Sequence, residues 1–437
     1  MPRRSAFVES AGGASCIGSI DCGGVFSRDS SREPALRSAT KTFIICVFVA
    51  AVASFAMTRS SAFLQGTDFP DFYCAARMLA AGHGHHLYDA DLQRQYQAHY
   101  AGRVGTLYIH PPFEAVLYLA VAWLPLRYAY LLWSSLNLAF LGVGARRLAK
   151  EILPWDWRLS LAASLTFVPA LLCFLQGQDS LLLLLLAVLA FAALRRGRGF
   201  AAGCWLGLGL FKFQLALPLA LVLVVTQSRN VRTGLVKGFG LIALSLAALS
   251  AAISGLSVFL IYPKFLLDLK ARPFAGVVPQ AMANFRGLTY FFFRSDYSSG
   301  SIITLSIVCA AMLIATLWGW EKMGRDNTGP NNKDEFDLAF ANSVLFALLV
   351  SYHLNPHDLS LLLLPIALLF GRGFGRTSGV RNPANWITLG WVGILFLPPL
   401  HLWTLRAGVY ALMSLPLLGL FSSLAFLLRR EETRAAN

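Results

Sequence analysis

Long apolar stretches follow one another along this chain, and they restrict its possible folds more than any other feature. Runs such as 181–186 and 361–364 consist of leucine alone. The chain has 437 residues, of which 56% are hydrophobic and only 14% are charged, which is too apolar for a soluble protein of this size. We therefore expect an all-α fold, a polytopic transmembrane helical bundle of about 10 spans with short re-entrant helices.

The basic residues are informative through their positions. The formal net charge is +15, which in a soluble protein would suggest nucleic acid as a partner. Here the basic residues concentrate in short loops between apolar stretches, as at 195–198 and 229–232. This pattern is typical of the cytoplasmic loops of membrane proteins. We therefore expect membrane lipids around the chain and no nucleic-acid partner.

The apolar stretches define one membrane domain with polar segments around it. Residues 1–40 are polar, rich in Gly, Ser and Arg and without periodicity, which predicts a disordered cytoplasmic tail. The first span covers about 42–57, and the basic residues before it place the N-terminus in the cytoplasm. The expected organisation is a transmembrane domain over 41–430, outer loops at 59–111 and 262–300, and a cytoplasmic tail at 431–437.

Two segments interrupt the alternation of spans. Residues 112–124 are apolar but too short to span, so they predict a re-entrant or half helix, after which 128–145 returns inward. If both pieces cross the membrane, the topology up to the next hairpin is inverted. Only 200–226 separates the two basic loops, which predicts a hairpin of two short helices that meet near 212–218.

The first outer loop carries a helical pattern and two carboxylates. Apolar residues recur at helical spacing over 69–79, and Gly82 can end the helix, so we expect a helix in the membrane interface. Asp68, Asp71 and Tyr73 lie at its start, and we expect Asp71 and Tyr73 to contact the substrate. A carboxylate at the water–lipid boundary can deprotonate a bound hydroxyl. Alternatively, Asp68 or Asp71 caps the helix.

A few polar side chains lie in or next to apolar segments, where burial is costly. His110 precedes a Pro-Pro pair, and Glu114 follows it within an apolar segment. Glu114 could pair with a buried cation or help to hold an acceptor. Lys212 is too central to reach the interface easily, and Gln214 after it is a further candidate for a substrate contact. The expected partner of Lys212 is a phosphate or an internal carboxylate.

A turn between two apolar helices has the sequence Gln-Gly-Gln-Asp at 176–179. Gly177 permits a tight turn, and Asp179 can cap the helix that follows. The side chains of Gln176 and Gln178 could hydrogen-bond the hydroxyls of a sugar. We expect capping from this turn, and a sugar contact stays open beside it.

Two histidines and a carboxylate join two helices near the outer face. His353, His357 and Asp358 suggest a metal site, but two of them are adjacent and no third firm ligand is evident, so we expect no metal. Phosphate or sugar binding is the favoured role, and a capped turn is the alternative. In the second outer loop, Asn284 could reach a phosphate or a sugar, as could Arg286. Signatures of nucleotide-binding loops and of protease sites are absent from the sequence.

Four stretches of the chain resemble a known family when taken in order. They are 67–89 (with TDFPDFYCAA), 107–133 (with YIHPPFEAVLY), 176–219 (with QGQDS and LFKFQ) and 351–365 (with SYHLNPHD). This order resembles glycosyltransferase family 87, whose members are polyprenyl-phosphate-dependent hexosyltransferases of the GT-C superfamily. The resemblance implies a GT-C-like helical bundle in the bacterial inner (plasma) membrane. It also implies an active site that faces the periplasm or exterior.

The resemblance also implies the substrates and the base. The donor would be a polyprenyl-phosphate sugar, most often of mannose, which is a substrate, so no cofactor is expected. The acceptor would be a lipid or a glycan. The aspartate that serves as general base in the family matches Asp68. Asp71 stands where the family usually has an apolar residue, and His110 stands where a tyrosine is expected.

The expected reaction is an inverting displacement. Asp68 takes the proton, while Lys212 and His353 or His357 stabilise the leaving phosphate. A transporter or flippase of lipid-linked sugars without chemistry is the competing function, although no clear internal inverted repeat supports it. A ligase or polymerase of lipid-linked polymers is a third possibility, and it would transfer whole oligosaccharides.

Overall fold

The chain is helical throughout the computed structural model, which describes residues 60–153, 155–268, 277–295, 298–321, 332–371 and 383–435. No strand occurs in these residues, and several helices are long and apolar enough to cross a membrane. The predicted all-α, polytopic membrane bundle is therefore confirmed. The predicted tail at 1–40 and the first span at about 42–57 lie outside the described residues.

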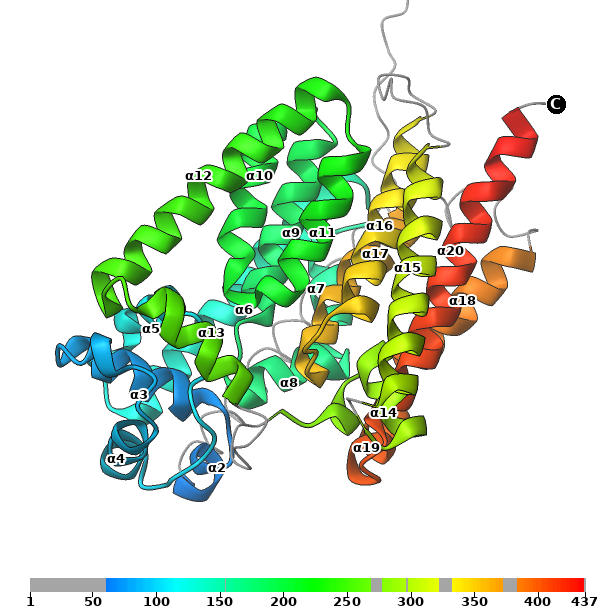
Figure 1. Cartoon of the computed structure of the whole chain (residues 1–437). Coiled ribbons are helices and arrows are strands. Elements are labelled where there is room, and N and C mark those ends of the chain that lie inside the picture. Colours follow the sequence, from blue (N-terminus) through cyan, green and yellow to red (C-terminus); the bar gives the residue numbers. More distant parts are fainter. Residues whose placement is uncertain are drawn as a thin grey trace, which may run out of the picture.

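Short helices form a layer at one end of the bundle, at the lower left of Figure 1. They are α2 (Ser61–Gln65), α3 (Phe69–Ala80), η1 (Gly84–His86), α4 (Ala90–Ala101) and α13 (Val258–Asp268). The helix expected over 69–79 is α3. Gly82, with φ +80°, follows its end in the left-handed conformation that glycine adopts without strain. We refer to these helices as the outer layer.

The other helices make up the bundle. In chain order they are α5 (Pro112–Ala122), α6 (Leu126–Glu151), α7 (Trp157–Leu165), α8 (Val168–Gln176), α9 (Ser180–Leu194), α10 (Gly199–Leu208), η2 (Gly209–Lys212), α11 (Phe213–Thr226), α12 (Arg229–Ser254), η4 (Pro279–Ala281), α14 (Phe285–Phe293), α15 (Ser299–Glu321), α16 (Asn332–Val350), η5 (Pro356–Leu362), α17 (Leu363–Gly371), α18 (Pro383–Leu395), α19 (Pro398–Arg406), η6 (Tyr410–Met413) and α20 (Ser414–Ala435). The centre is formed by α9 and α16, whose residues are mostly buried. By contrast, only 11% of the apolar window of α12 is buried, so α12 presents most of its surface to lipid.

Five helical runs among the described residues qualify as spans by length and composition, or up to seven if each bent pair is one span, but one of the five, 199–226, folds back on itself. The two bent pairs are α7 with α8, at 73°, and α18 with α19, at 53°. The expected number of about 10 also included shorter apolar helices and the first span. Helix α5 has 11 residues and rises only about 16 Å, whereas a bilayer core is about 30 Å thick. A half helix at 112–124 therefore fits the structure.

The run from α10 to α11 folds back on itself at η2. A Cβ at Gly199 would lie 2.1 Å from O of Val231, and one at Gly207 would lie 2.8 Å from Cβ of Ile242. The contacts advance together along both helices, so α10 and α12 run in the same direction. Because a short link joins α11 to α12, α11 must return to the level at which α10 begins, and Figure 1 shows the two side by side. The predicted hairpin is confirmed, with Lys212 in its turn.

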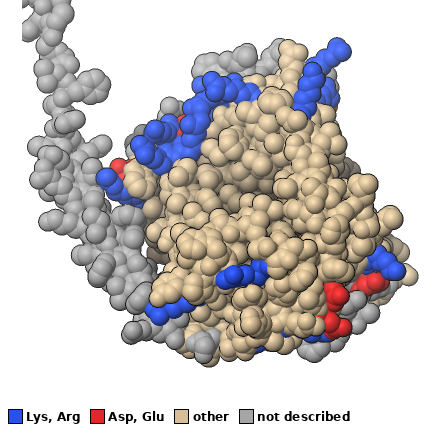
Figure 2. All heavy atoms as spheres, turned by 90° about the vertical axis from the view of Figure 1, so that its left-hand side faces the viewer, with Lys and Arg blue, Asp and Glu red and all other residues tan. Residues whose placement is uncertain are grey.

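The charged side chains are unevenly distributed along the bundle. Figure 2 shows most Lys and Arg along the upper rim of one face, an uncharged band below it, and both basic and acidic side chains in the lower part. At the end of the bundle where α6 and α9 end, Arg195 donates a hydrogen bond of 2.7 Å to O of Glu151, and Arg196 pairs with the Glu151 carboxylate. The end of α6 and the loop after α9 therefore meet here. We refer to this end of the bundle as the basic end.

Candidate active site

Asp68 lies at the start of α3, where the outer layer meets the bundle. It occupies the N-cap position, but its side chain makes no capping hydrogen bond. Instead, Oδ2 accepts a hydrogen bond of 2.6 Å from Nε2 of Gln178, and the backbone N–H donates one of 3.0 Å to Oε1 of Gln176. The alternative that Asp68 caps the helix is therefore wrong. The half-buried carboxylate stays accessible at the edge of the bundle.

The turn between α8 and α9 positions the two glutamines. Gly177 has φ +67°, a conformation that is strained for residues with a side chain. A Cβ at this position would also lie 2.6 Å from Cβ of Phe69. The turn thus packs directly on the first residue of α3, which brings Gln176 and Gln178 to Asp68. The predicted tight turn is confirmed, and a contact of the glutamines with a sugar stays a prediction.

Asp71 belongs to a separate set of contacts inside the outer layer. Its Oδ1 lies 3.1 Å from Nη2 of Arg103 and accepts a hydrogen bond of 3.0 Å from Gln97, and its Oδ2 accepts one from Thr106. Burial raises the pKa of Asp71 from 3.8 to about 7, against the opposing effect of Arg103. Asp71 therefore fastens α3 to α4 and to the segment after it, and it does not cap α3.

Tyr73 also makes its contacts within the protein. Its side chain is buried, and its hydroxyl donates a hydrogen bond of 2.8 Å to O of Leu124. Nη2 of Arg77 donates a hydrogen bond of 2.9 Å to the same hydroxyl. These bonds fasten α3 to the end of α5. The predicted contact of Tyr73 with substrate stays a prediction.

His110 and Glu114 connect the start of α5 to the site. Nδ1 of His110 lies 3.0 Å from Oε1 of Glu114, and the His110 ring packs on Phe72 with centroids 4.8 Å apart. Burial lowers the pKa of His110 to about 3, so the ring is neutral at physiological pH. Glu114 is fully buried, and its carboxyl group is within hydrogen-bonding reach of Asp179. Glu114 thus extends the site toward the buried charges around Lys212.

Lys212 is enclosed by carboxylates. Its Nζ lies 3.2 Å from Oδ1 of Asp179 and 2.9 Å from Oδ1 of Asp358, and the residue is only 2% exposed. The sequence left two expected partners for Lys212, a phosphate or an internal carboxylate. The partners in the structure are internal carboxylates. Helix α10 has 10 residues, so the turn that carries Lys212 lies about 15 Å from the basic end, near the middle of a bilayer. A charge at this depth requires compensation, which the two carboxylates provide.

The two carboxylates come from separate elements. Asp179 occupies the N-cap position of α9 but makes no capping hydrogen bond, because its side chain pairs with Lys212. The predicted capping role of Asp179 is therefore wrong. Asp358 lies in η5, where its Oδ2 accepts a hydrogen bond of 2.8 Å from the N–H of Asn355 and its Oδ1 accepts one of 2.8 Å from Ser180. The capped turn that the sequence offered as an alternative is thus present at Asp358.

His353 and His357 flank the same turn. Nε2 of His357 lies 3.6 Å from Oδ1 of Asp358 and has no hydrogen-bond partner among the described residues. Burial lowers the pKa of His353 to about 4, which leaves the ring neutral. Within the described part of the chain, no group of His, Cys, Asp and Glu could hold a metal ion.

The remaining predicted residues lie beside this cluster. Asn284 caps α14, since its Oδ1 accepts a hydrogen bond of 2.9 Å from the N–H of Gly287. Its Nδ2 donates a hydrogen bond of 2.7 Å to O of Ser351, so both ends of the side chain are used within the protein. Gln214 is half-buried in the first turn of α11. Substrate contacts of Asn284 and Gln214 stay predictions.

Sequence reasoning missed several residues that support the site. Asn137 of α6 donates a hydrogen bond of 2.8 Å to O of Gln178. Tyr118 of α5 packs between Phe72 and Trp133, with ring centroids 4.7 and 4.2 Å away. Asn137 could have been found, because a buried amide inside an apolar helix is as unusual as Lys212. The aromatic residues carry no such signal, since they are equally common in any packed core.

The arrangement combines a proton acceptor with hydrogen-bond donors at membrane depth. The carboxylate of Asp68 is oriented by Gln178 and can accept the proton of a hydroxyl. Nε2 of His357 is buried 3.6 Å from Oδ1 of Asp358 and makes no hydrogen bond among the described residues. Next to these groups, the charge of Lys212 is paired with those of Asp179 and Asp358.

Comparison with known proteins assigns the chain to a family. The model of glycosyltransferase family 87 matches residues 108–351, which is more than half of the 437 residues. The match covers the stretch at 176–219 and does not reach Asp68. Among solved structures, the crystal structure of ArnT from Cupriavidus metallidurans bound to undecaprenyl phosphate is similar, with 15% identity, a TM-score of 0.34, and coverage of 90% of this chain and 77% of that chain. No curated protein sequence matched. On the strength of the family match, this chain belongs to glycosyltransferase family 87 and is a membrane glycosyltransferase.

Proposed function

We propose that this glycosyltransferase moves a hexose, with mannose as the first candidate, from a polyprenyl-phosphate sugar to a lipid or glycan acceptor. Membership of the family supports transfer of a sugar. A lipid-linked donor suits a site whose polar groups lie at membrane depth and which needs no nucleotide pocket. Asp68 lies at the end opposite the basic end, and the positive-inside rule assigns that end to the non-cytoplasmic face. The single observation that carries the proposal is that Asp68 is partly exposed and its carboxylate makes no helix-capping hydrogen bond.

Asp68 is the general base of an inverting displacement. The acceptor hydroxyl gives its proton to the carboxylate while its oxygen forms a bond to the anomeric carbon of the donor sugar. The bond between that carbon and the phosphate oxygen breaks, and its electron pair leaves with polyprenyl phosphate. The hydrogen bond from Gln178 orients the carboxylate for this step. General base catalysis of this kind contributes roughly 10²–10⁴-fold to the rate.

Neutral imidazoles, rather than a buried cation, are the proposed partners of the leaving phosphate. His357 contributes a buried Nε2 that makes no hydrogen bond in the described residues, and His353 stands four positions before it in the sequence. Lys212 is a weaker candidate, because its contacts within 3.2 Å are internal carboxylates. We assign Lys212 a positioning role. It ties the α8–α9 turn to η5, and these two elements carry Gln178 and His357.

A transfer assay tests the proposal. Purified protein in lipid vesicles receives labelled polyprenyl-phosphate mannose and a membrane lipid extract. We expect wild type to form a glycosylated product and Asp68→Asn to form it at least about 10²-fold more slowly. Asp71→Asn is the matched control, because it removes a nearby carboxylate that is bound inside the outer layer, and it should retain transfer.

The outcomes separate the class of donor from the identity of the base. Full activity of Asp68→Asn would refute the assignment of the base and leave the donor class standing. No product from wild type with mannose, glucose or arabinose donors would refute the donor class. Products that carry whole oligosaccharides would instead identify a ligase or polymerase.

A further inference from the structure

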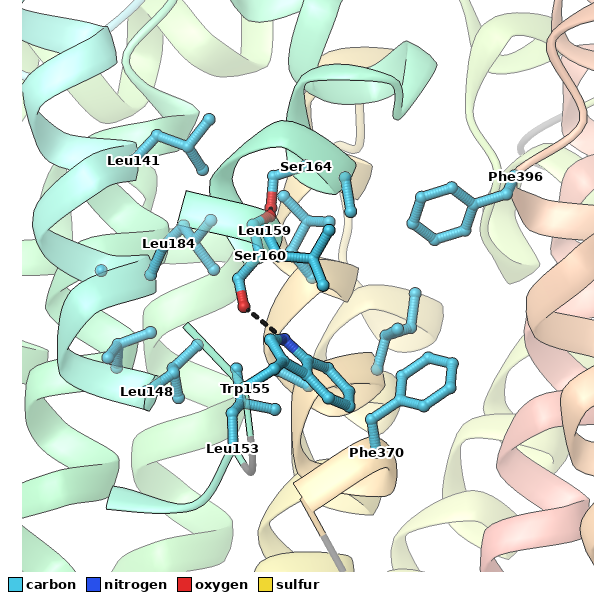
Figure 3. Close-up of a pocket in the computed structure, with 17 residues that line it drawn as sticks. Leu141, Leu148, Leu153, Trp155, Leu159, Ser160, Ser164, Leu184, Phe370 and Phe396 are labelled. Atoms are coloured by element: carbon cyan, nitrogen blue, oxygen red, sulfur yellow. Dashed lines mark hydrogen bonds between the residues drawn. The ribbon is translucent and has the colours of Figure 1, made fainter. Parts of the chain in front are cut away.

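An apolar cavity lies in the half of the bundle nearest the basic end, away from Asp68. Its volume is about 300 Å³, and it is bounded by α6, α7, α9 and α17. Figure 3 shows Leu148 and Leu184 on one side, Phe370 and Phe396 on the other, and Trp155 between them. None of these residues has a place in the proposed reaction.

The lining of the cavity requires an apolar occupant. Its polar side chains make hydrogen bonds within the protein: Nε1 of Trp155 donates one of 2.8 Å to Oγ of Ser160, and Oγ of Ser164 donates one of 2.8 Å to the backbone O of Ser160. The other lining residues are apolar. An apolar cavity of roughly 150 Å³ stays dry and binds benzene. A cavity of about 300 Å³ therefore has room for a segment of a hydrocarbon chain.

The cavity opens toward the surrounding lipid. Leu159 of α7 lines it and is 56% exposed, so the wall of the cavity reaches the surface of the molecule. Along α6 the lining extends from Leu148 back to Leu141, which is about 15 Å from Glu151 at the basic end. The cavity thus occupies the depth of the membrane leaflet at the basic end.

Cationic side chains stand on the helices that bound the basic end of the cavity. Lys150 is exposed in the last turn of α6, and Arg158 lies in the first turn of α7. Neither forms an ion pair with any described residue, whereas the neighbouring carboxylate of Glu151 is bound by Arg147 and Arg196. An apolar cavity with cations at its end is complementary to a lipid with an anionic headgroup.

We propose that this cavity binds an acyl chain of an anionic phospholipid from the leaflet at the basic end, with the lipid phosphate beside Lys150 and Arg158. The donor is also an anionic lipid, but the proposed function places its phosphate at the opposite end. The site side is formed by α8 and η5, which pack on each other with Sγ of Cys173 3.4 Å from O of His357, and the residues that line the cavity come from other elements. This lipid site therefore does not depend on the identity of the donor.

Native mass spectrometry of the purified full-length protein tests the site. The probes are dioleoyl phosphatidylglycerol, dioleoyl phosphatidylcholine and polyprenyl phosphate. We expect one phosphatidylglycerol to bind more tightly than phosphatidylcholine. The double variant Lys150→Gln/Arg158→Gln should weaken this binding by roughly tenfold or more. The control Arg229→Gln/Arg232→Gln removes two exposed charges at the same end and should leave the binding unchanged.

A second variant tests the cavity itself. Gly144 lines it, and a Cβ there meets no atom within 4 Å, so Gly144→Phe should fill the space and abolish the phosphatidylglycerol complex. Gly240→Phe on α12 is the control, because a Cβ at Gly240 also meets nothing within 4 Å. Unchanged binding by both the charge variant and Gly144→Phe would overturn the site. Retention of polyprenyl phosphate in the cavity, without phosphatidylglycerol, would overturn the assigned occupant.

Discussion

At the scale of single residues, Lys212 joins three segments that are far apart in sequence. Its ammonium group meets the carboxylates of Asp179, after α8, and of Asp358, in η5. Glu114 of α5 adds a further acid next to Asp179. Acids therefore outnumber cations in this cluster. Removing the lysine should cost more than removing one of the acids, because it leaves buried carboxylates without a counter-charge.

Lys212→Met should lower the free energy of unfolding by about 3–5 kcal/mol, the usual cost of an uncompensated buried charge. The measurement is thermal unfolding of the detergent-purified protein, with Lys237→Met on the exposed surface of α12 as the control. Adding Asp179→Asn to Lys212→Met should cost less than the sum of the single effects, because the two groups are in contact. Equal unfolding temperatures of Lys212→Met and Lys237→Met would contradict the positioning role.

Asp71 should make stability depend on pH. Burial raises its pKa in the folded protein from 3.8 to about 7, so between these values the folded state binds more protons than the unfolded state. The contribution of Asp71 to stability therefore decreases as the pH rises from about 4 to about 7. Asp71→Asn should reduce the change of the unfolding temperature with pH over this range. Asp91→Asn, which replaces a side chain that is 84% exposed, should not. If the unfolding temperature of Asp71→Asn changes more steeply with pH than that of wild type, the predicted direction of the pH effect is wrong.

At the scale of elements, close packing between glycines holds the hairpin against α12. A Cβ at Gly203 of α10 would lie 2.1 Å from O of Leu235, and one at Gly238 of α12 would lie 2.1 Å from O of Phe200. Distances this short do not occur for real Cβ atoms, so the two backbones can approach only where side chains are missing. The position of the turn that carries Lys212 depends on this contact.

Gly203→Leu should force α10 and α12 apart and destabilise the protein by at least about 1–3 kcal/mol, the usual range for overpacking. The readouts are the unfolding temperature and the fraction of monodisperse protein after detergent extraction. Gly240→Leu is the control on α12, where a Cβ meets nothing within 4 Å. If Gly203→Leu unfolds at the wild-type temperature, the packing of the two helices is looser than described.

At the scale of the whole molecule, the basic loops and the outer layer lie at opposite ends of the bundle. The hairpin returns the chain to the basic end, which keeps the loop after α9 and the start of α12 on one side. Asp68 and the outer layer then lie on the other side. The positive-inside rule predicts which side is cytoplasmic.

Cysteine labelling in intact cells checks this orientation. The seven native cysteines are first replaced, and then Asp91→Cys in α4 or Arg198→Cys before α10 is introduced. A membrane-impermeant maleimide should label Asp91→Cys in intact cells and Arg198→Cys only after permeabilisation. The opposite pattern would invert the topology and move the proposed site to the cytoplasmic face.

Much of the fold could be predicted from the order of residues along the chain. Hydropathy indicates membrane helices, because burial in lipid depends on local composition. Local spacing and charge indicate further features in the same way. They are the apolar residues at helical spacing in α3, the turn at Gly177 and the hairpin between two basic loops. These features were therefore found without the tertiary structure.

The partners of the polar residues were decided only by the tertiary structure. Asp68 and Asp179 both precede helices, and local rules favour capping by each of them. In the folded chain, Asp68 instead binds Gln178, and Asp179 binds Lys212. Both pairs depend on how the helices pack. For Asp179, a buried charge at membrane depth attracts a carboxylate more strongly than a helix end does. The sequence by itself thus determined which residues would be costly to bury, and the packing determined which of them compensate one another.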